Sequence, residues 1–131
     1  MRKEDISIIV ADDVNTMRIQ IKELLRLFGF KKILLCANGE EVKKLMELEK
    51  IQLILSDWHM FPTDGLDLLK HIRAHPIHKE TAFVMVTAES TIDKVVEAVT
   101  SGVDEYLLKP LTAMQVQSKV HGALLKKRVF T

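Results

Sequence analysis

Short apolar runs recur along the chain, and each is followed by a segment with helical spacing. The runs cover residues 6–11, 33–37, 53–56, 82–86 and 106–108. Runs of this length are typical of strands buried on both faces of a parallel sheet. The segments between them place apolar residues three or four positions apart, as amphipathic helices do. This alternation predicts an α/β fold in which a parallel sheet carries helices on both faces.

Local signals define some of the helix ends and faces. Asn15 is expected to cap the first helix. The basic run at residues 126–128 suits the negative end of the last helix dipole and is expected to be solvated. The fourth helical segment carries an apolar stripe that is expected to pack mostly into the core, with a rim for partners. That stripe consists of Ile92, Val95, Val96 and Val99.

The run at residues 53–56 leads directly into Asp57. Taken alone, an acid after a strand is most often a residue that caps a turn. The carboxyl ends of parallel strands, however, lie at one edge of the sheet, where open α/β sheets bind ligands. The residues delivered to that edge are Asp12, Asp13, Asp57, Thr87 and Lys109. This combination of acids with one lysine favours a functional site over chance.

The residue types at this edge suit phosphoryl chemistry. Clustered carboxylates raise one another's pKa unless a cation relieves them. Mg²⁺ characteristically takes one or two carboxylates and keeps several waters. Beside such an ion and Lys109, Asp57 is placed to attack phosphorus and form an aspartyl phosphate. The Thr87 hydroxyl can then donate to a phosphoryl oxygen, a contact able to bias a two-state loop.

Composition narrows the class of protein. The 131 residues suffice for one domain, and 47% hydrophobic with 28% charged residues is ordinary for a globular protein. A net charge of +1 gives no reason to expect nucleic acid or a membrane surface as partner. Cys36 stands alone, and the sequence has no signal core or membrane-spanning run, so we expect a cytoplasmic protein. His71, His75 and His78 lack a metal-ligand pattern and are expected to form a solvated helix end.

The motifs resemble those of a known family, in register over essentially the whole chain. The chain is similar to the response-regulator receiver domains, and most closely to their single-domain chemotaxis type. The resemblance implies a flavodoxin-like, doubly wound (βα)5 sandwich with strand order 2-1-3-4-5, forming one receiver domain over residues 1–131. The residues that carry it are Asp12-Asp13, Thr16-Met17-Arg18, Leu24-Leu25, Gly29-Phe30, Ser56-Asp57-Trp58, Asp64-Gly65-Leu66, Leu68-Leu69-Lys70, Val86-Thr87-Ala88-Glu89, Gly102, Tyr106 and Lys109-Pro110-Leu111-Thr112-Ala113.

The resemblance also implies roles for single residues. Asp57 is the expected phosphoacceptor, and Asp13 and Asp57 the expected direct ligands of Mg²⁺, for which Mn²⁺ can substitute. Asp12 would hold the metal through water, and the backbone carbonyl of His59 would coordinate it. Lys109 would contact the phosphoryl group, and its peptide bond to Pro110 would be cis. Thr87 and Tyr106 would form the switch pair, although taken alone Tyr106 reads as a half-buried strand aromatic.

The implied partners are proteins. A sensor histidine kinase would donate the phosphoryl group, a phosphatase can act on the product, and the chain is expected to be a monomer. The resemblance predicts a phosphoacceptor that catalyses its own phosphotransfer and slow autodephosphorylation, not a classical enzyme, with His59 and Glu89 modulating the site. The output surface would form from the fourth helix, fifth strand and fifth helix, with the flagellar switch as one target. Its predicted residues are Ile92, Val95, Val99, Tyr106 and Lys119.

Some positions depart from the family pattern. The family usually has Met-Pro after the phosphoacceptor, whereas this chain has Met60-Phe61-Pro62, which shifts the proline's constraint onto Phe61. The loop beside the metal is therefore expected to be reshaped. At the output surface, Thr91-Ile92 replaces basic residues, Glu105 replaces a small residue and Leu111 stands where an aromatic is common. These changes weaken the case for a flagellar target and leave phosphotransfer untouched.

Four alternatives remain open at this point. The chain can be a receiver of another two-component pathway, or one that has lost phosphorylation and binds constitutively. A haloacid-dehalogenase-type phosphatase would use Asp57 as nucleophile but wants a second acid where His59 stands. A nucleotide or flavin binder would need a glycine-rich first loop, and residues 12–15 carry acids instead.

Overall fold

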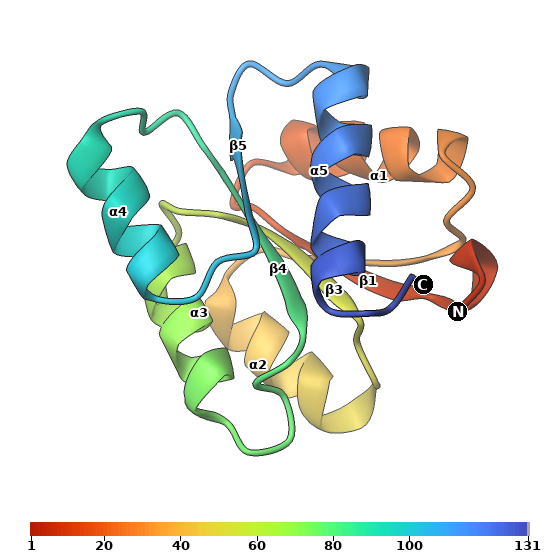
Figure 1. The fold of residues 1–131 in the computed structure, drawn as a ribbon, viewed down its shortest axis with the longest axis horizontal. Coiled ribbons are helices and arrows are strands. Elements are labelled where there is room, and N and C mark those ends of the chain that lie inside the picture. Colours follow the sequence, from red (N-terminus) through yellow and green to blue (C-terminus); the bar gives the residue numbers. More distant parts are fainter. Residues whose placement is uncertain (131) are drawn as a thin grey trace.

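The computed structural model describes residues 1–130. Within this range five parallel strands form one sheet in the order β2-β1-β3-β4-β5, with helices on both faces (Figure 1). The flavodoxin-like fold predicted from the sequence is therefore confirmed. The strands are β1 (Ser7–Ala11), β2 (Lys32–Cys36), β3 (Leu53–Asp57), β4 (Ala82–Thr87) and β5 (Glu105–Leu108). The helices are α1 (Asn15–Leu27), α2 (Gly39–Leu48), α3 (Gly65–Ala74), α4 (Ile92–Thr100) and α5 (Ala113–Lys126), and a 3₁₀ turn at Lys3–Asp5 precedes β1.

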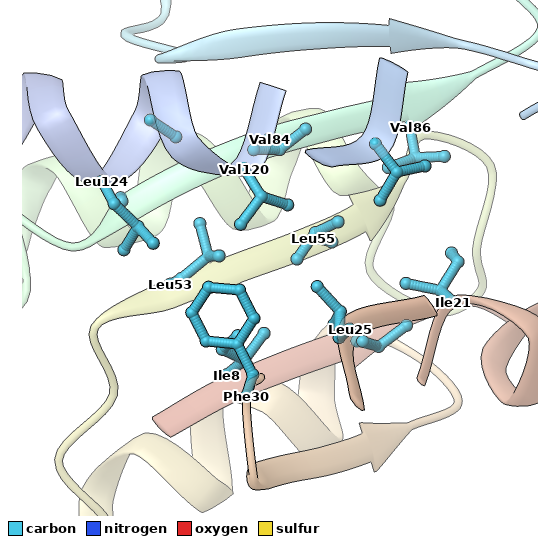
Figure 2. Close-up of a cluster of buried hydrophobic side chains, with 14 of the residues drawn as sticks. Ile8, Ile21, Leu25, Phe30, Leu53, Leu55, Val84, Val86, Val120 and Leu124 are labelled. Atoms are coloured by element: carbon cyan, nitrogen blue, oxygen red, sulfur yellow. The ribbon is translucent and has the colours of Figure 1, made fainter. Parts of the chain in front are cut away.

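Two apolar clusters hold the layers together, one on each face of the sheet. On one face, Leu25 of α1 and Leu124 of α5 belong to the same buried cluster as Leu53 of β3 (Figure 2). On the other face, α2 and α3 bury their apolar sides against residues such as Ile54 and Phe83. Burying one such side chain stabilises the fold by roughly 1.5–3 kcal/mol. None of the helices in residues 1–130 has the length and hydropathy needed to span a bilayer.

The register of the central strands brings the polar residues to one edge. Ala11 of β1 pairs with Ser56 of β3, so Asp12 and Asp57 are the next residues along these neighbouring strands. Asp57 in turn pairs with Val86, one residue before Thr87 ends β4. The register of the buried strands thus fixes where along the strand direction each polar side chain lies at the carboxyl edge.

The start of α1 differs from the sequence prediction. The expectation that Asn15 caps this helix is wrong, because Asn15 is its first residue and Val14 occupies the N-cap position without a side-chain bond. Asn15 Oδ1 instead accepts a hydrogen bond from Arg18 Nη2 at 3.1 Å. The other four helices begin at capping side chains, those of Asn38, Asp64, Thr91 and Thr112.

Helix α4 presents most of its apolar stripe to solvent. Ile92 is 80% exposed, Val99 60% and Val96 54%, whereas Ala98 is fully buried and Val95 is half-buried. The prediction that this stripe packs mostly into the core is therefore wrong. The reason is position, because β5 is an edge strand of the sheet and α4 lies at that end of the molecule (Figure 1).

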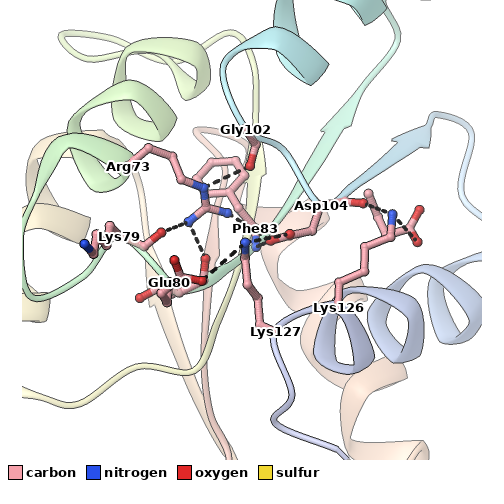
Figure 3. A network of polar contacts seen from close by, with 10 residues as sticks. Arg73, Lys79, Glu80, Phe83, Gly102, Asp104, Lys126 and Lys127 are labelled. Atoms are coloured by element: carbon pink, nitrogen blue, oxygen red, sulfur yellow. Dashed lines mark hydrogen bonds and ion pairs between the residues drawn. The ribbon is translucent and has the colours of Figure 1, made fainter.

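The amino edge of the sheet carries a charged network (Figure 3). Arg73 Nη2 donates to Asp104 Oδ2 at 2.9 Å, and the rest of its guanidinium donates to the carbonyls of Lys79, Thr81 and Gly102. Lys127 Nζ lies 3.3 Å from Asp104 Oδ1. Part of the basic run at residues 126–128 is therefore engaged in ion pairs, so the prediction of a solvated terminus is wrong for Lys127.

Candidate functional site

Three carboxylates meet at the carboxyl edge of the sheet. Asp12 and Asp13 follow β1, and Asp57 ends β3. Each offers an oxygen, and these oxygens all lie within 4.8 Å of one another. Asp12 is 1% and Asp57 7% exposed, whereas Asp13 is open to solvent. Two of the acids are therefore held in the protein, with the third at the mouth of the site.

One ammonium group faces these acids. Lys109 follows β5, and its Nζ lies 3.4 Å from Asp12 Oδ2 and 3.5 Å from Asp57 Oδ2. Its backbone N–H donates to the carbonyl of Thr87 at 2.9 Å, and its peptide bond to Pro110 is cis. Three carboxylates against one ammonium leave two negative charges, which is the charge that a divalent cation would balance.

The surroundings of Asp57 disfavour its charged form. Burial, followed by the nearby Asp12 carboxylate, raises the pKa of Asp57. The ammonium of Lys109 and the N–H of Trp58, which donates to Asp57 Oδ1 at 2.8 Å, act in the opposite direction. A carboxylate in this state gains from a further cation, because opposite charge restores the ionised form.

The donor set fits Mg²⁺. All the side-chain donors are hard carboxylate oxygens, which Mg²⁺ prefers, and the acids outnumber the local base. Within residues 1–130 this is the one group of three acids, histidines or cysteines that lie close enough to share an ion. The histidines at the end of α3 are not such a group, since His75 Nδ1 accepts from the backbone N–H of Ile77 at 3.1 Å. The cluster is therefore able to hold a metal ion.

The loop after Asp57 is packed tightly against it. The N–H of Gly65 donates to the carbonyl of Trp58 at 2.8 Å, and a Cβ at Gly65 would stand 2.2 Å from the carbonyl oxygen of Asp57. A glycine is therefore required where α3 begins. The shifted proline leaves Met60 buried and Phe61 86% exposed, with a cis bond between Phe61 and Pro62.

Glu89 connects the predicted switch residues. Its N–H donates to Thr87 Oγ1 at 3.1 Å, and its carbonyl accepts from the Tyr106 hydroxyl at 2.7 Å. Its carboxylate lies 2.9 Å from His59 Nε2, on the loop that follows Asp57. Burial raises the pKa of Tyr106. Glu89 therefore connects the predicted switch residues, Thr87 and Tyr106, with the predicted modulator His59. Its backbone makes the contacts to the switch residues, which the identity of its side chain does not indicate.

A contact that sequence reasoning missed links Trp58 to α4. The ring of Trp58 is buried, and Lys94 Nζ lies 5.1 Å from the ring centroid. A cation over an indole face is attracted by the ring quadrupole. Lys94 lies in the first turn of α4, a position for which the sequence carries no motif. The contact places an optical probe between the acid cluster and α4.

The predicted output residues are arranged in two sets. Ile92 and Val99 are exposed on α4, with Val95 half-buried beside them and Tyr106 on the neighbouring strand β5. Lys119 lies apart from these, on α5, where its Nζ is 3.5 Å from Glu105 Oε2. The structure therefore does not leave Lys119 as an unengaged charge.

Fold, acid cluster and sequence agree on one class of protein. The sequence pattern of the family described as "Response regulator receiver domain" matches residues 8–121. The chain therefore belongs to the response regulator receiver domains of two-component signalling systems. Members of this family are signalling proteins and not classical enzymes.

Named relatives and solved structures are consistent with this family. The chemotaxis protein CheY-3 of Vibrio cholerae is 33% identical over 117 residues, covering 89% of this chain and 90% of that protein. The chemotaxis protein CheY of Pseudomonas aeruginosa is 35% identical over 113 residues, covering 86% and 91%. A response regulator receiver domain protein from Clostridium thermocellum superposes with a TM-score of 0.83 at 27% identity, over 96% of this chain and 99% of that chain. The chemotaxis response regulator CheY4 of Vibrio cholerae, at 23% identity and a TM-score of 0.84, covers 91% and 98% and shares the fold.

Proposed function

We propose that this chain is a phosphorylation switch in which Asp57 accepts a phosphoryl group from a histidine kinase. The observation that carries the proposal is the cluster of three carboxylate oxygens within 4.8 Å, with Lys109 Nζ 3.5 Å from Asp57 Oδ2. A buried acid with a raised pKa, set against a lysine at a ligand-binding edge, is a poor structural element and a good candidate for chemistry.

The transfer is a displacement at phosphorus. A carboxylate oxygen of Asp57 bonds to phosphorus while the bond from phosphorus to the kinase's imidazole nitrogen breaks. The imidazole leaves with that electron pair and then takes up a proton. Lys109 keeps Asp57 ionised and neutralises charge on the phosphoryl oxygens. Thr87, buried at the end of β4, is placed to donate its hydroxyl to the product.

Mg²⁺ is the proposed cofactor, with Asp13 and Asp57 as direct ligands, Asp12 acting through water and the His59 carbonyl completing the set. When bound, the ion supplies positive charge that offsets the negative charge of the phosphoryl oxygens, and Mn²⁺ can take its place. Asp13, whose carboxylate is exposed, would hold the ion at the mouth of the site, where water and phosphate have access.

Loss of the phosphoryl group is proposed to depend on the contact between His59 and Glu89. This pair, 2.9 Å apart, joins the loops that follow β3 and β4. We propose that it controls how the attacking water approaches Asp57. We expect His59→Ala and Glu89→Ala each to change the autodephosphorylation half-life by about twofold to tenfold. Radiolabel decay after loading with acetyl phosphate measures it. Unaltered half-lives in both variants would remove this role.

The output is proposed to be a protein partner bound after Thr87 and Tyr106 rearrange. The Tyr106 hydroxyl holds the Glu89 carbonyl, so a Thr87 drawn towards phosphate would disturb the segment that carries this bond. Relatives that are named chemotaxis proteins favour a chemotaxis pathway with the flagellar switch as target. The replaced residues at the output surface favour the alternative, a receiver of another two-component pathway. A dedicated phosphatase can serve in either pathway.

We further propose that residues 1–131 act as one receiver domain, monomeric and cytoplasmic, although Thr131 lies outside the described residues. The contiguous core on both faces of a single sheet supports the single domain. The lone, buried Cys36 suits a reducing compartment. Analytical ultracentrifugation before and after beryllofluoride loading tests the monomer, and a shift to a dimer on loading would contradict it.

Trp58 fluorescence tests the proposed function. Trp58 adjoins Asp57 and has Lys94 over its ring, so binding of Mg²⁺ and then of beryllofluoride should change its emission in two steps. Asp57→Asn should lose the second step. No response in the parent chain, or an unchanged response in Asp57→Asn, would contradict the proposal.

A further inference from the structure

Glu105 occupies a fitted position between two lysines of α5. Its Oε2 lies 3.5 Å from Lys119 Nζ, and its Oε1 lies 3.3 Å from Lys126 Nζ. The side chain of Glu105 is 18% exposed, whereas those of the two lysines are 40% and 55% exposed. Lys126 Nζ also donates to the carbonyl of Asp104 (Figure 3). One carboxylate thus offsets one of the two positive charges of these lysines within the chain.

Gly122 makes room for this carboxylate. It lies between the two lysines on the same side of α5, three residues after one and four before the other. A Cβ at Gly122 would stand 2.5 Å from Glu105 Oε1. A glycine inside a helix costs about 1 kcal/mol relative to alanine, so its presence here needs a reason. The absence of a Cβ at Gly122 lets the carboxylate of Glu105 lie directly against α5.

The neighbouring part of the same surface is apolar. Along β5, alternate side chains point to opposite faces, so Glu105 lies on the α5 side and Leu108, 43% exposed, on the α4 side. Ile92, Val96 and Val99 are three or four residues apart on α4 and share one side of it. Lys94 reaches Trp58 from a different side of α4, so the exposed stripe is free of the charge it carries.

We propose that Glu105 is a specificity-determining residue of the output surface, which lowers the attraction of this surface for acidic groups so that a partner segment is selected by its apolar contacting side. The inference rests on the proposed function, since the surface is the one expected to act after phosphorylation. Glu105 offsets one of the two positive charges that would otherwise attract an acidic partner. An acid on a partner has to share the lysines with Glu105 or displace it, so it adds less affinity than it would without Glu105. The partner's contribution comes from apolar contact with α4 and Leu108.

A pair of synthetic amphipathic helical peptides tests the proposal. Both peptides carry the same leucine face. Beside this face, the acidic peptide has glutamates and the neutral peptide has glutamines. Affinities are measured by fluorescence anisotropy on the full chain loaded with Mg²⁺ and beryllofluoride. The parent chain, in which one positive charge remains, should favour the acidic peptide by no more than about twofold. Glu105→Ala, which frees both lysines, should prefer the acidic peptide by about fivefold, the scale of exposed ion pairs.

Two further variants separate masking from other effects. Gly122→Ala keeps Glu105 but adds a Cβ 2.5 Å from the position of its Oε1, so the flexible end of Glu105 has to shift. This variant should therefore raise the preference for the acidic peptide by less than Glu105→Ala does, while favouring the helix. Val96→Asp, at an exposed position, should weaken both peptides equally. The proposal is overturned if the parent already prefers the acidic peptide as strongly as Glu105→Ala does. It is also overturned if neither peptide binds the loaded parent, or if Val96→Asp changes nothing.

Activation is followed on the same samples. Trp58 emission reports whether beryllofluoride has loaded each protein. A parent chain that fails to load contradicts the proposed function itself. A chain that loads and does not discriminate as described contradicts the role of Glu105 alone.

Discussion

The two edges of the sheet carry polar clusters of different character. At the carboxyl edge, Asp12, Asp13 and Asp57 face the single ammonium of Lys109, and burial raises the pKa of Asp57. At the amino edge, Arg73 and Lys127 face Asp104 and Glu80, and each nitrogen of the Arg73 guanidinium donates at least one hydrogen bond (Figure 3). One cluster carries excess charge of one sign, and the other is balanced.

This difference separates a structural network from a reactive site. The balanced network connects α3, β4, the loop before β5 and the end of α5, and its charges are satisfied within the protein. The acid cluster carries an excess of negative charge that a cation from solution would balance. Unbalanced charge at one place, while the rest of the fold is satisfied, is typical of functional sites. The following variants test the contrast.

Arg73→Met should have the largest effect on stability. It leaves the carboxylate of Asp104 buried with the weaker support of Lys127, so we expect a loss of about 3 kcal/mol in the free energy of unfolding. Urea denaturation measures this loss. Phosphorylation by acetyl phosphate should persist, because Arg73 lies at the opposite edge from Asp57.

A matched control for Arg73 is available on the surface. Lys43→Met breaks the more exposed pair with Glu40, 3.3 Å apart, and should cost less than about 1 kcal/mol. Equal losses in the two variants would show that burial of the Arg73 network has no special importance.

Mg²⁺ should stabilise the parent chain by completing the acid cluster. At a concentration about 100 times its Kd, the ion should add about 2.7 kcal/mol to the free energy of unfolding. Asp13→Asn should lose most of this gain and still fold, because Asp13 is exposed. Asp67→Asn changes an exposed acid outside the cluster and should retain the stabilisation by Mg²⁺. A gain of the same size in both variants would argue against binding at the cluster.

Asp57→Asn should stabilise the metal-free protein by about 1 kcal/mol, because it removes a charge that burial and Asp12 disfavour. The pKa of Asp57 is raised above its ordinary 3.8 in the folded state, so the folded chain holds the proton more tightly than the unfolded chain. The free-energy cost of burying a charged Asp57 is absent at low pH, where the group is protonated, and develops as the pH rises through the folded-state pKa. The stability difference should therefore grow from about pH 4 towards neutrality, and a difference that shrinks over this range would contradict it.

Much of the fold follows from the sequence because buried parallel strands leave an unmistakable pattern. The run ending in Ser56-Asp57 and the acids after β1 specify both the sheet and its ligand-binding edge. Proximity of Asp57 and Lys109, far apart in the chain, follows from topology once the strands are recognised. The metal ligands and the switch roles stay predictions, since geometry alone does not assign chemistry.

Other features depend on long-range packing that periodicity cannot express. The stripe of α4 has a core-like spacing, yet position at the sheet edge leaves Ile92 and Val99 exposed. Asn15 has a side chain suited to capping, but α1 begins at this residue, and its Oδ1 accepts from Arg18 instead. The fit of Glu105 to Gly122 joins residues whose proximity only the packed β5 and α5 create.

The most direct test of the account is the mass of the protein after incubation with acetyl phosphate. With Mg²⁺ present, the parent chain should gain the mass of one phosphoryl group, and fragmentation should place it on Asp57. Removing Mg²⁺ with a chelator, or replacing Asp57 with Asn, should abolish the gain. A phosphoryl group found on another residue, or gained equally without the ion, would contradict the claim that the acid cluster is a magnesium-dependent phosphorylation site.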